Sequence, residues 1–476
     1  MWTPDLRPRR GPRYLAIADA LADDAGAGRL PAGTRLPTHR DLAERLGVTV
    51  GTVTRGYAEA VRRGLVSGEV GRGTFVRAAA GLGLAAVAPA PAEPGLIDLS
   101  ANLPPEAPGE RTGAALGRTL AALAQRKDLE RLLGYPPEGG APEHRAAGAA
   151  WVRRCGLEVP AARLLVSSGS QHGMTAVFAA LLSPGDLVLT EALTYPGMKA
   201  LASLLSLRLQ GLTMDEDGLL PDALAAACRS GSPRALYCLP TLQNPTTAVM
   251  PEARRREIAA VAREHGLLVV EDDVHGHLPE KAPRPLSAHL PELAVYLNGT
   301  SKSLAPGLRV GFIAAPKGLV PRLGAAIRGT TWMAAPLMAE IAARWIQDGT
   351  AEAVLGRKRK EAAARQALAA RVLAGARFDA HPAAYHVWLH LPEPWRADGF
   401  AAAARAQGVV VTPAAAFAAT GGASPRGGGR RGAAVPEAVR VCLGAARDRL
   451  ELERGLNVLG GLVRAAPQAA PLPTGP

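Results

Sequence analysis

A lysine within a short polar turn has the most distinctive chemistry in this sequence. Lys302 lies in the segment NGTSKSLAPGLRVGFI, residues 298–313, between two expected strands, and Arg309 follows it by seven residues. Burial and a nearby cation lower the pKa of a lysine from about 10.4, and the neutral amine can then bond to a carbonyl group. Such a turn alone is usually a surface loop, so this interpretation depends on companion motifs.

Two companion motifs place polar residues beside apolar runs. In LLVSSGSQHGM, residues 164–174, a glycine turn leads into a helix whose first N–H groups can bind a phosphate, helped by Ser170 and Gln171. In CLPTLQNPTTAVM, residues 238–250, Asn244 can donate its amide to a phenolic oxygen of a ligand. Each signal is weak alone, because similar turns are common.

An acid and two further side chains complete the candidate site. In LLVVEDDVHGHL, residues 267–278, Asp272 follows an apolar strand, where a buried carboxylate needs a cationic partner such as a protonated ring nitrogen. Two histidines in the same motif make a divalent metal an alternative. Tyr195 can stack on an aromatic ring, and Arg440 can hold a carboxylate through two hydrogen bonds. Either residue alone is more often structural.

The elements that must position these residues alternate between short apolar runs and amphipathic helices. From Ile97 to about Arg464, this alternation predicts an α/β fold with a mostly parallel central sheet. The expected strands are Leu164–Ser167, Leu187–Thr190, Ala235–Leu239, Leu267–Glu271, Val295–Asn298 and Val310–Ala314. Later runs predict a small C-terminal α+β subdomain, with strands at His386–Leu391, Val409–Thr412 and Val439–Leu443.

The first part of the chain has the pattern of a winged helix-turn-helix DNA reader. Thr38 can cap a short helix, and Gly47 permits the turn into a longer one. The buried face of the longer helix is expected to carry Val53, Tyr57 and Val61, and its opposite face Thr49, Gly51, Thr52 and Arg55. Leu65–Ser67 and Thr74–Val76 predict a two-stranded wing, with Arg72 between them. The alternative is a generic three-helix unit with a hairpin.

Composition and charge limit the classes of protein. The net charge of +13 suits a polyanionic partner, or merely solubility, and the four scattered cysteines lack zinc-site spacing. We expect a cytoplasmic protein, because the sequence has no signal peptide and no apolar run of about 18 residues. The expected organisation is a DNA-binding domain at 12–77, an Ala/Pro/Gly linker at 78–96, a large domain at 97–464 and a disordered tail at 465–476, with a mobile loop at Gly421–Ala434.

Residues 12–77 resemble the GntR family of winged-helix regulators through LPTHRDLA, GVTVGTV and GLVSGEVGRGTFV. The resemblance implies that Arg40 contacts DNA and that Thr49 and Thr52 belong to the recognition helix. The candidate DNA-binding residues are Arg35, Thr38, Arg40, Thr49, Gly51, Thr52, Arg55 and Arg72. Val50 stands where the family usually has an arginine that reads guanine, so the protein is expected either to read another base there or to depend on Arg55 and Arg72 instead.

The motifs of the large domain, in their order along the chain, resemble the class I/II aminotransferases of fold type I. The resemblance implies pyridoxal 5'-phosphate (PLP) as cofactor, and Lys302 as the residue that bonds to it. It assigns Asp272 to the pyridine nitrogen, Asn244 to the phenolic oxygen, Tyr195 to ring stacking and Arg440 to a substrate carboxylate. The phosphate would be held by Ser170, Gln171, Ser301 and Arg309, with Tyr135 reaching the phosphate of a neighbouring subunit in a dimer.

Two positions depart from the aminotransferase pattern. His275 replaces a tyrosine that acts on the phenolic oxygen, and a histidine is expected to titrate near neutrality. Gly299 replaces a serine that commonly donates to the phosphate. These departures favour cofactor binding over efficient transamination.

The two parts together resemble the MocR subfamily of regulators. The resemblance implies a head-to-tail homodimer that binds promoter DNA and senses an amine, an amino acid or a B6 vitamer. The alternatives are a working aminotransferase with an appended DNA-binding head, and a metal-dependent or structural DNA-binding protein without PLP.

Overall fold

The computed structural model describes residues 2–4, 6, 12–26, 30, 34–62, 65–69, 73–76, 95–107, 109, 112–419 and 435–465. The chain divides into two compact units, Met1–Gly83 and Leu84–Pro476. Arg72, most of the expected linker, the loop Gly421–Ala434 and all but the first residue of the expected tail lie outside the described residues. None of the described helices is long and apolar enough to cross a membrane.

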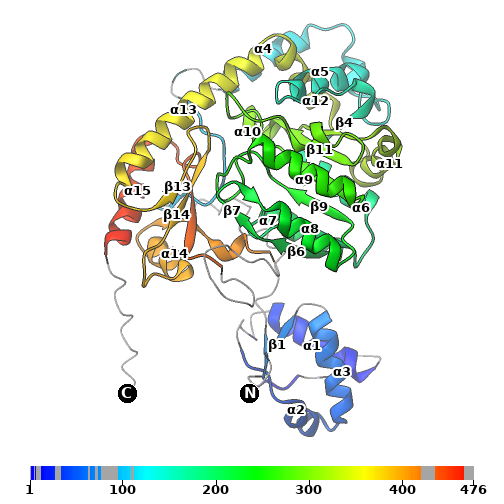
Figure 1. Ribbon diagram of the computed structural model, residues 1–476, viewed down its shortest axis with the longest axis vertical. Coiled ribbons are helices and arrows are strands. Elements are labelled where there is room, and N and C mark those ends of the chain that lie inside the picture. The colour runs from blue at the N-terminus through cyan, green and yellow to red at the C-terminus, as the bar shows by residue number, and fades with distance from the viewer. Residues whose placement is uncertain are drawn as a thin grey trace. The chain divides into compact units, whose positions relative to one another are not determined.

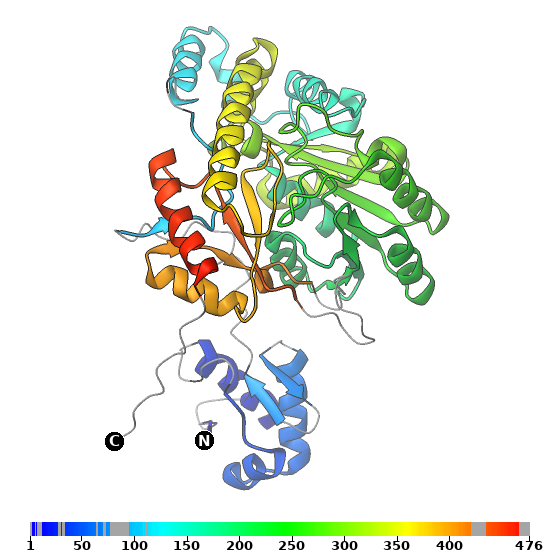
Figure 2. The ribbon, with the colours of Figure 1, turned by 60° about the vertical axis from the view of Figure 1, so that its left-hand side comes forward.

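The first unit is a three-helix bundle with a hairpin, drawn in blue in Figures 1 and 2. Its elements are α1 Arg13–Gly26, α2 His39–Leu46, α3 Val50–Arg62, β1 Val66–Glu69 and β2 Gly73–Val76. Thr38 caps α2 by accepting from the Asp41 N–H at 3.3 Å, and Gly47 ends it in the left-handed conformation. The strands of the expected wing pair in antiparallel register, Val66 opposite Val76.

One expected core position of this unit is wrong. Val61 is 50% exposed, whereas Val53, Tyr57 and Ala60 are buried against Ile17 and Leu21 of α1 in one apolar cluster. Residues four apart advance about 40° beyond a full helical turn, so after eight residues the side chain has left the buried face. Ala60, seven residues after Val53, returns almost to the same side.

The second unit contains a seven-stranded sheet in the order β4-β12-β11-β10-β9-β5-β6. Its strands are β4 Leu164–Ser167, β5 Leu187–Glu191, β6 Arg208–Leu212, β9 Ala235–Cys238, β10 Leu268–Asp272, β11 Ala294–Gly299 and β12 Gly311–Ala314. Only β12 runs against its neighbours, so the predicted mostly parallel sheet is confirmed. The edge strand β6 was not predicted, because RLQGL is partly polar and only its end is buried.

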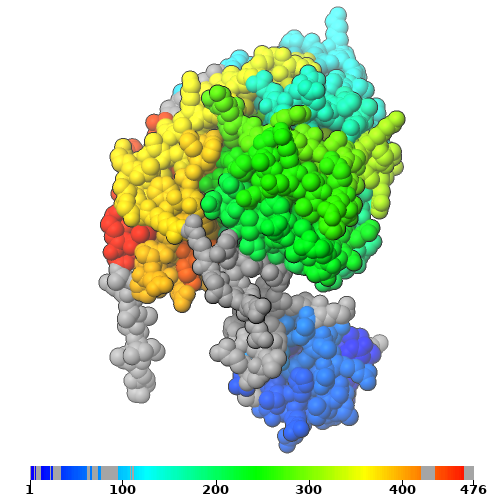
Figure 3. Space-filling view, viewed as in Figure 1, coloured from blue at the N-terminus to red at the C-terminus, as the bar shows by residue number. Residues whose placement is uncertain are grey.

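Helices cover both faces of this sheet, so neighbouring residues of one strand pack into different clusters. Val270 belongs to the cluster that includes Met174 and Leu201, and Val269 belongs to the cluster that includes Leu224 and Ile258. The helices are α4 Thr112–Ala124, α5 Pro142–Arg153, α6 Ser170–Leu181, α7 Pro196–Leu204, α8 Pro221–Ser230, α9 Glu252–Glu264, α10 Thr300–Ser303, α11 Val320–Thr331, α12 Pro336–Gln347 and α13 Thr350–Val372. Side chains of α8 and α9 form the green face of Figure 3.

A second sheet, of four strands in the order β13-β14-β17-β16, forms the predicted small C-terminal subdomain. Its strands are β13 Phe378–Asp379, β14 His386–His390, β16 Thr412–Pro413 and β17 Ala438–Cys442, and its helices are α14 Ala397–Ala406 and α15 Arg449–Arg464. The short strand β3 Ile97–Asp98 pairs with β15 Val409–Val410, so the chain enters this unit through the small subdomain. A two-residue hairpin pair, β7 Met214–Asp215 and β8 Gly218–Leu219, follows β6.

Candidate functional site

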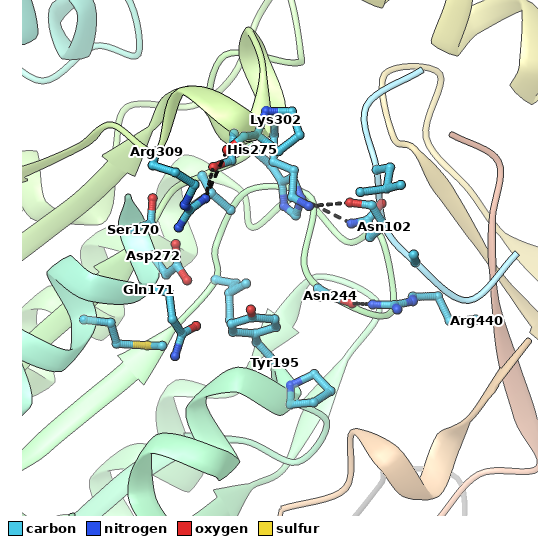
Figure 4. A pocket seen from close by; sticks show the side chains of 18 residues that line it. Asn102, Ser170, Gln171, Tyr195, Asn244, Asp272, His275, Lys302, Arg309 and Arg440 are labelled. Carbon is cyan, nitrogen blue, oxygen red and sulfur yellow. Dashed lines mark hydrogen bonds between the residues drawn. The ribbon is translucent and has the colours of Figure 1, made fainter. Parts of the chain in front are cut away.

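A cavity of about 210 Å³ lies where the parallel strands end, between the large sheet and the small subdomain. Figure 4 shows its labelled side chains converging from different elements. Ten of the predicted residues line it, namely Ser170, Gln171, Tyr195, Asn244, Asp272, His275, Ser301, Lys302, Arg309 and Arg440. Tyr135 does not; its ring is 77% exposed and packs against that of Trp332, with centroids 5.6 Å apart.

Lys302 reaches the cavity from α10, the short helix that directly follows β11. Its main-chain carbonyl accepts from the Tyr385 hydroxyl at 2.8 Å, which fixes the base of the side chain. The Nζ atom donates to the main-chain carbonyl of Asn102. Burial and the neighbouring Arg440 lower the pKa of Lys302 to about 8, so a sizeable fraction of this amine is neutral near pH 7 to 8.

Asp272 ends β10, and its carboxylate has one satisfied and one unsatisfied oxygen. Oδ2 accepts from the Tyr237 hydroxyl at 2.7 Å. Oδ1 is buried and has no hydrogen-bond partner among the described residues. Burial raises the pKa of Asp272 to about 6, because the Tyr237 hydrogen bond and the charge of Lys302 compensate only in part for the loss of solvent. A protonated ring nitrogen supplies both the missing donor and the missing charge.

The predicted phosphate turn joins β4 to α6. Gly169 has a φ of 88°, and a side chain there would collide with the Arg309 guanidinium. Arg309 donates from Nη1 to Ser301 Oγ at 3.2 Å and from Nη2 to the Ser168 carbonyl at 3.4 Å. The helix N-terminus, Ser301 and this arginine therefore surround one end of the cavity with donors suited to an anion.

The departure at Gly299 has a structural reason. A Cβ atom at this position would lie 2.5 Å from Ser170 Oγ, which itself donates to the Asn298 carbonyl at 3.2 Å. Ser170 thus occupies the space that a serine at position 299 would need. The glycine at position 299, at the end of β11, therefore leaves room for Ser170 of the phosphate turn, which follows β4.

Tyr195 precedes α7, and its ring lines the cavity beside Pro196. A side chain at Gly197 would collide with the Tyr195 ring, so this glycine permits the observed ring position. Gln171 donates to the Gly197 carbonyl at 3.4 Å, while its Oε1 is buried with no partner in the described part of the chain. A hydrogen bond therefore joins the phosphate turn to the segment that carries Tyr195, the predicted stacking residue.

The structure contradicts the expectation that His275 titrates near neutrality. Its ring is buried, and burial together with Lys302 lowers the pKa of His275 to about 3. The ring is therefore neutral at physiological pH and does not titrate near neutrality. Its Nε2 lies 3.5 Å from Nδ2 of Asn102, a cavity residue that the sequence motifs did not indicate.

Arg440 projects from β17 and is only 3% exposed. It donates to Asn244 Oδ1 at 2.8 Å and to the Ser100 carbonyl at 2.6 Å, and its guanidinium carbon lies 4.8 Å from the centroid of the Phe417 ring. Both hydrogen bonds go to neutral oxygens, and Nε has no partner within the described ranges. A buried guanidinium in this state favours an anionic ligand.

The metal alternative for EDDVHGH is not supported by the geometry. Glu271 accepts from the N–H groups of Leu286 and Ser287, and Asp273 accepts from the Tyr296 hydroxyl at 2.7 Å. His277 stacks on Trp151 with ring centroids 4.1 Å apart. The described residues contain no group of three or more His, Cys, Asp or Glu side chains placed to hold a metal.

His172, which the motifs did not single out, positions the phosphate turn. Its Nδ1 accepts from the Ser168 N–H at 3.0 Å, and its Nε2 lies 2.7 Å from Thr330 Oγ1. The acceptor role requires the neutral ring, and burial lowers the pKa of His172 from 6.5, which preserves that form.

We expect His172→Ala to weaken cofactor binding about fivefold, the effect of losing one hydrogen bond of about 1 kcal/mol. Because the folded-state pKa lies below 6.5, the turn keeps its acceptor above pH 6.5 and loses it as the pH falls further. Cofactor titrations of the wild type and His172→Ala between pH 5 and 8 should therefore converge at acid pH. Exposed His265 supplies the control variant, His265→Ala. Parallel pH curves for the wild type and His172→Ala would contradict this role.

The candidate DNA-binding residues lie on α2, α3 and the segment before α2. Arg40, Thr49, Gly51 and Arg55 are exposed, and Thr52 is partly exposed. Thr49 also has a structural role, because its Oγ1 accepts from the Thr52 N–H at 3.2 Å and so caps α3. The remaining candidates Arg35 and Thr38 are exposed as well. Val50, at the start of α3, is 45% exposed, which leaves it open to contact from outside.

We expect Arg40→Ala to weaken binding to DNA from upstream of the protein's own gene about tenfold, the loss typical of one arginine contact. Fluorescence anisotropy at several salt concentrations measures the loss of affinity. If Arg40 binds a phosphate, the slope of log affinity against log salt concentration should decrease by about one in the variant. The control is Arg45→Ala at the end of the same helix. Unchanged affinity in Arg40→Ala would remove this residue from the interface.

Comparisons with known proteins find a matching family for each of the two units of the chain. The family model of class I and II aminotransferases matches residues 94–459, and the model of bacterial regulatory proteins of the gntR family matches residues 13–76. A solved structure of LysN, the α-aminoadipate aminotransferase of Thermus thermophilus, has a TM-score of 0.67 at 26% identity, covering 78% of this chain and 92% of that one. The second unit is thus an aminotransferase domain of fold type I.

Relatives show how the two parts belong together. YdeF of Bacillus subtilis, described as an uncharacterised HTH-type transcriptional regulator, is 32% identical over 97% of this chain and 96% of its own length. A 2-aminoadipate transaminase of Thermus thermophilus is 31% identical over 69% of this chain and 83% of its own. The chain belongs to the MocR-like regulators, in which a GntR-type helix-turn-helix domain is fused to a class I/II aminotransferase domain.

The cofactor of this family is pyridoxal 5'-phosphate, and the cavity fits it. The unpartnered Oδ1 of Asp272 suits the ring nitrogen, the donors around Ser170 and Arg309 suit the phosphate, and Lys302 offers a partly neutral amine. When bound, the cofactor supplies an aldehyde that links to amines and a ring that accepts electrons.

Proposed function

We propose that this protein is a PLP-binding transcription regulator that senses an amine, an amino acid or a B6 vitamer through its aminotransferase-like domain. The observation that carries this proposal is a cavity lined by ten of the predicted cofactor and ligand contacts, on a chain that also has a GntR-type DNA-binding unit. In this function Lys302 bonds to the cofactor, Asp272 holds the ring nitrogen and Tyr195 stacks on the ring. The phosphate is bound by Ser170, Gln171, Ser301 and Arg309.

Within this range of ligands, the cavity favours an amino acid. Arg440 is a buried cation whose observed partners are neutral oxygens, so a carboxylate improves its electrostatic environment more than a simple amine does. Asn244, which accepts from Arg440, connects this group to the side of the cavity assigned to the phenolic oxygen. A ligand with both an amino group and a carboxylate engages Lys302 and Arg440 together.

We further propose that the protein acts as a head-to-tail homodimer. Leu133 and Tyr135 are strongly exposed, and the Tyr135 ring is in contact with the exposed ring of Trp332. Large apolar side chains exposed together are typical of protein interfaces. In a dimer, Tyr135 is then available to the phosphate of the neighbouring subunit.

The test combines colour with DNA binding. Purified protein incubated with PLP is expected to become yellow and to lose that absorbance on borohydride reduction, with the added mass on the peptide that contains Lys302. The same protein is expected to bind DNA upstream of its own gene, and amino acids screened one at a time are expected to change that affinity. Protein that stays colourless with PLP contradicts the proposal, as does DNA affinity that no amino compound changes.

A working aminotransferase is the second candidate, supported by the same cofactor contacts and by transaminase relatives. His275 is buried and neutral, and it stands where the aminotransferases have a tyrosine that acts on the phenolic oxygen of the cofactor. This replacement argues for slow transamination. Rapid exchange between amino and keto acids, without any effect of these compounds on DNA binding, would favour the enzyme instead.

A further inference from the structure

The segment Ile97–Glu106, which we call the strap, follows the expected linker and runs along the cavity. Its first residues belong to the small subdomain: β3 pairs with β15, and the Leu99 N–H donates to the Val410 carbonyl at 2.9 Å. The Ser100 carbonyl accepts from Arg440 at 2.6 Å and from the Cys442 thiol at 3.3 Å. The start of the strap is therefore fixed to β17 and β15.

The middle of the strap contacts the opposite side of the cavity. The Asn102 carbonyl accepts from Lys302 Nζ, in a tight turn where the Leu103 N–H donates to the Ala101 carbonyl at 2.8 Å. Figure 4 shows the Lys302 side chain directed at this segment, which carries Asn102. One hydrogen bond therefore joins the cofactor lysine, in the large subdomain, to the strap.

This hydrogen bond depends on the chemical state of Lys302. A free amine or ammonium donates to the Asn102 carbonyl, as observed. Once Nζ is bonded to the cofactor's aldehyde carbon, with loss of the aldehyde oxygen as water, its position is set by that bond. When another primary amine takes over the carbon, its nitrogen forms the new bond, the bond to Nζ breaks, and two hydrogens pass to Nζ. Lys302 is then free again.

We propose that Asn102 is a positioning residue that holds Lys302 whenever this lysine is free, so that the strap is fastened in the ligand-bound state and released in the state where cofactor alone is attached. This inference rests on the proposed function and adds the segment of the chain that responds to the chemical state of Lys302. The expected linker, residues 78–96, ends directly before β3, where the strap begins. Ligand exchange at Lys302 thus changes how firmly the middle of the strap is held to the large subdomain, while its first residues stay paired with β15.

Hydrogen–deuterium exchange of the peptide spanning the strap tests this inference without knowledge of the natural effector. Three samples of the full chain are compared: free of PLP, loaded with PLP, and loaded with PLP then treated with hydroxylamine, whose amine displaces Lys302 from the cofactor. We expect slow exchange in the first, about tenfold faster exchange in the second and slow exchange again in the third, as one hydrogen bond to a charged donor is lost and regained.

Two variants separate the donor from the covalent link. Lys302→Arg keeps a cationic donor but cannot form the link, so the strap should exchange slowly with or without PLP. Lys302→Met has neither, so it should exchange fast in both conditions, whereas the exposed control Lys317→Met should behave as the wild type. The inference is overturned if PLP leaves strap exchange unchanged or slows it, or if hydroxylamine fails to restore protection. Colour and DNA binding, measured on the same samples, show separately whether the proposed function holds.

Discussion

Lys302→Ala is expected to abolish covalent attachment of PLP completely and, with it, any response of DNA binding to amino compounds. The reason is that Nζ is an amine lining the same cavity as Asp272 and Arg309, with its pKa lowered to about 8. The measurement is the mass of the borohydride-treated protein, together with its visible absorbance. Lys317→Ala, at an exposed lysine, should behave as the wild type.

The pH dependence of attachment follows from the same pKa. Only the neutral amine attacks an aldehyde, so the rate of attachment should rise with pH up to about 8 and then level off. An ordinary lysine would show a rise that continues toward about 10.4. A wild-type rate that keeps increasing well above pH 8, or a Lys302→Ala protein that still gains the reduced adduct, would refute the assignment of this lysine.

Arg440→Leu is expected to weaken the binding of amino-acid ligands about 100-fold, equivalent to about 3 kcal/mol. The guanidinium is buried, lies against the Phe417 ring and donates to the neutral oxygens of Asn244 and Ser100, so a ligand carboxylate gains an ion pair in a poorly solvated place. Calorimetric or spectroscopic titration of PLP-loaded protein with amino acids measures the loss. Binding of simple amines, which lack the carboxylate, should change much less.

Arg396→Leu is the matched control, because Arg396 is exposed in the small subdomain and pairs with Glu437 away from the cavity. If Arg440→Leu binds amino acids as tightly as Arg396→Leu does, the carboxylate site lies elsewhere. A lower PLP content in Arg440→Leu would instead indicate that the guanidinium mainly positions Asn244.

Strands could be predicted from the sequence where all of their residues are buried. Strands such as β9 and β12 are buried on both faces, so their residues are continuously apolar and visible in the sequence. The edge strand β6 has exposed and partly buried residues, and no such run marks it. Val61 was assigned to the core by a repeat of four, which a helix of 3.6 residues per turn does not maintain.

The candidate site was predictable where side-chain type carries the chemistry, as at Lys302, Asp272 and Arg440. The environment of a side chain is harder to predict from the sequence. We expected His275 to titrate near neutrality, because the residue type does not show that its ring is buried. Asn102 was missed because its contact to Lys302 comes from a main-chain carbonyl, which every residue possesses. Long-range contacts of this kind, here across 200 positions, leave no local pattern.

The reversed strand β12 has a consequence for ligand selection. Because β12 returns directly from the turn after β11, Lys302 and Arg309 lie on one short connection of the large sheet, whereas Arg440 lies on β17 of the other sheet. A ligand that spans Lys302 and Arg440 would therefore bridge the two sheets, and the number of atoms separating its nitrogen from its carboxylate would limit how far apart they can lie. Homologous compounds of increasing chain length would thus hold this domain at graded degrees of closure.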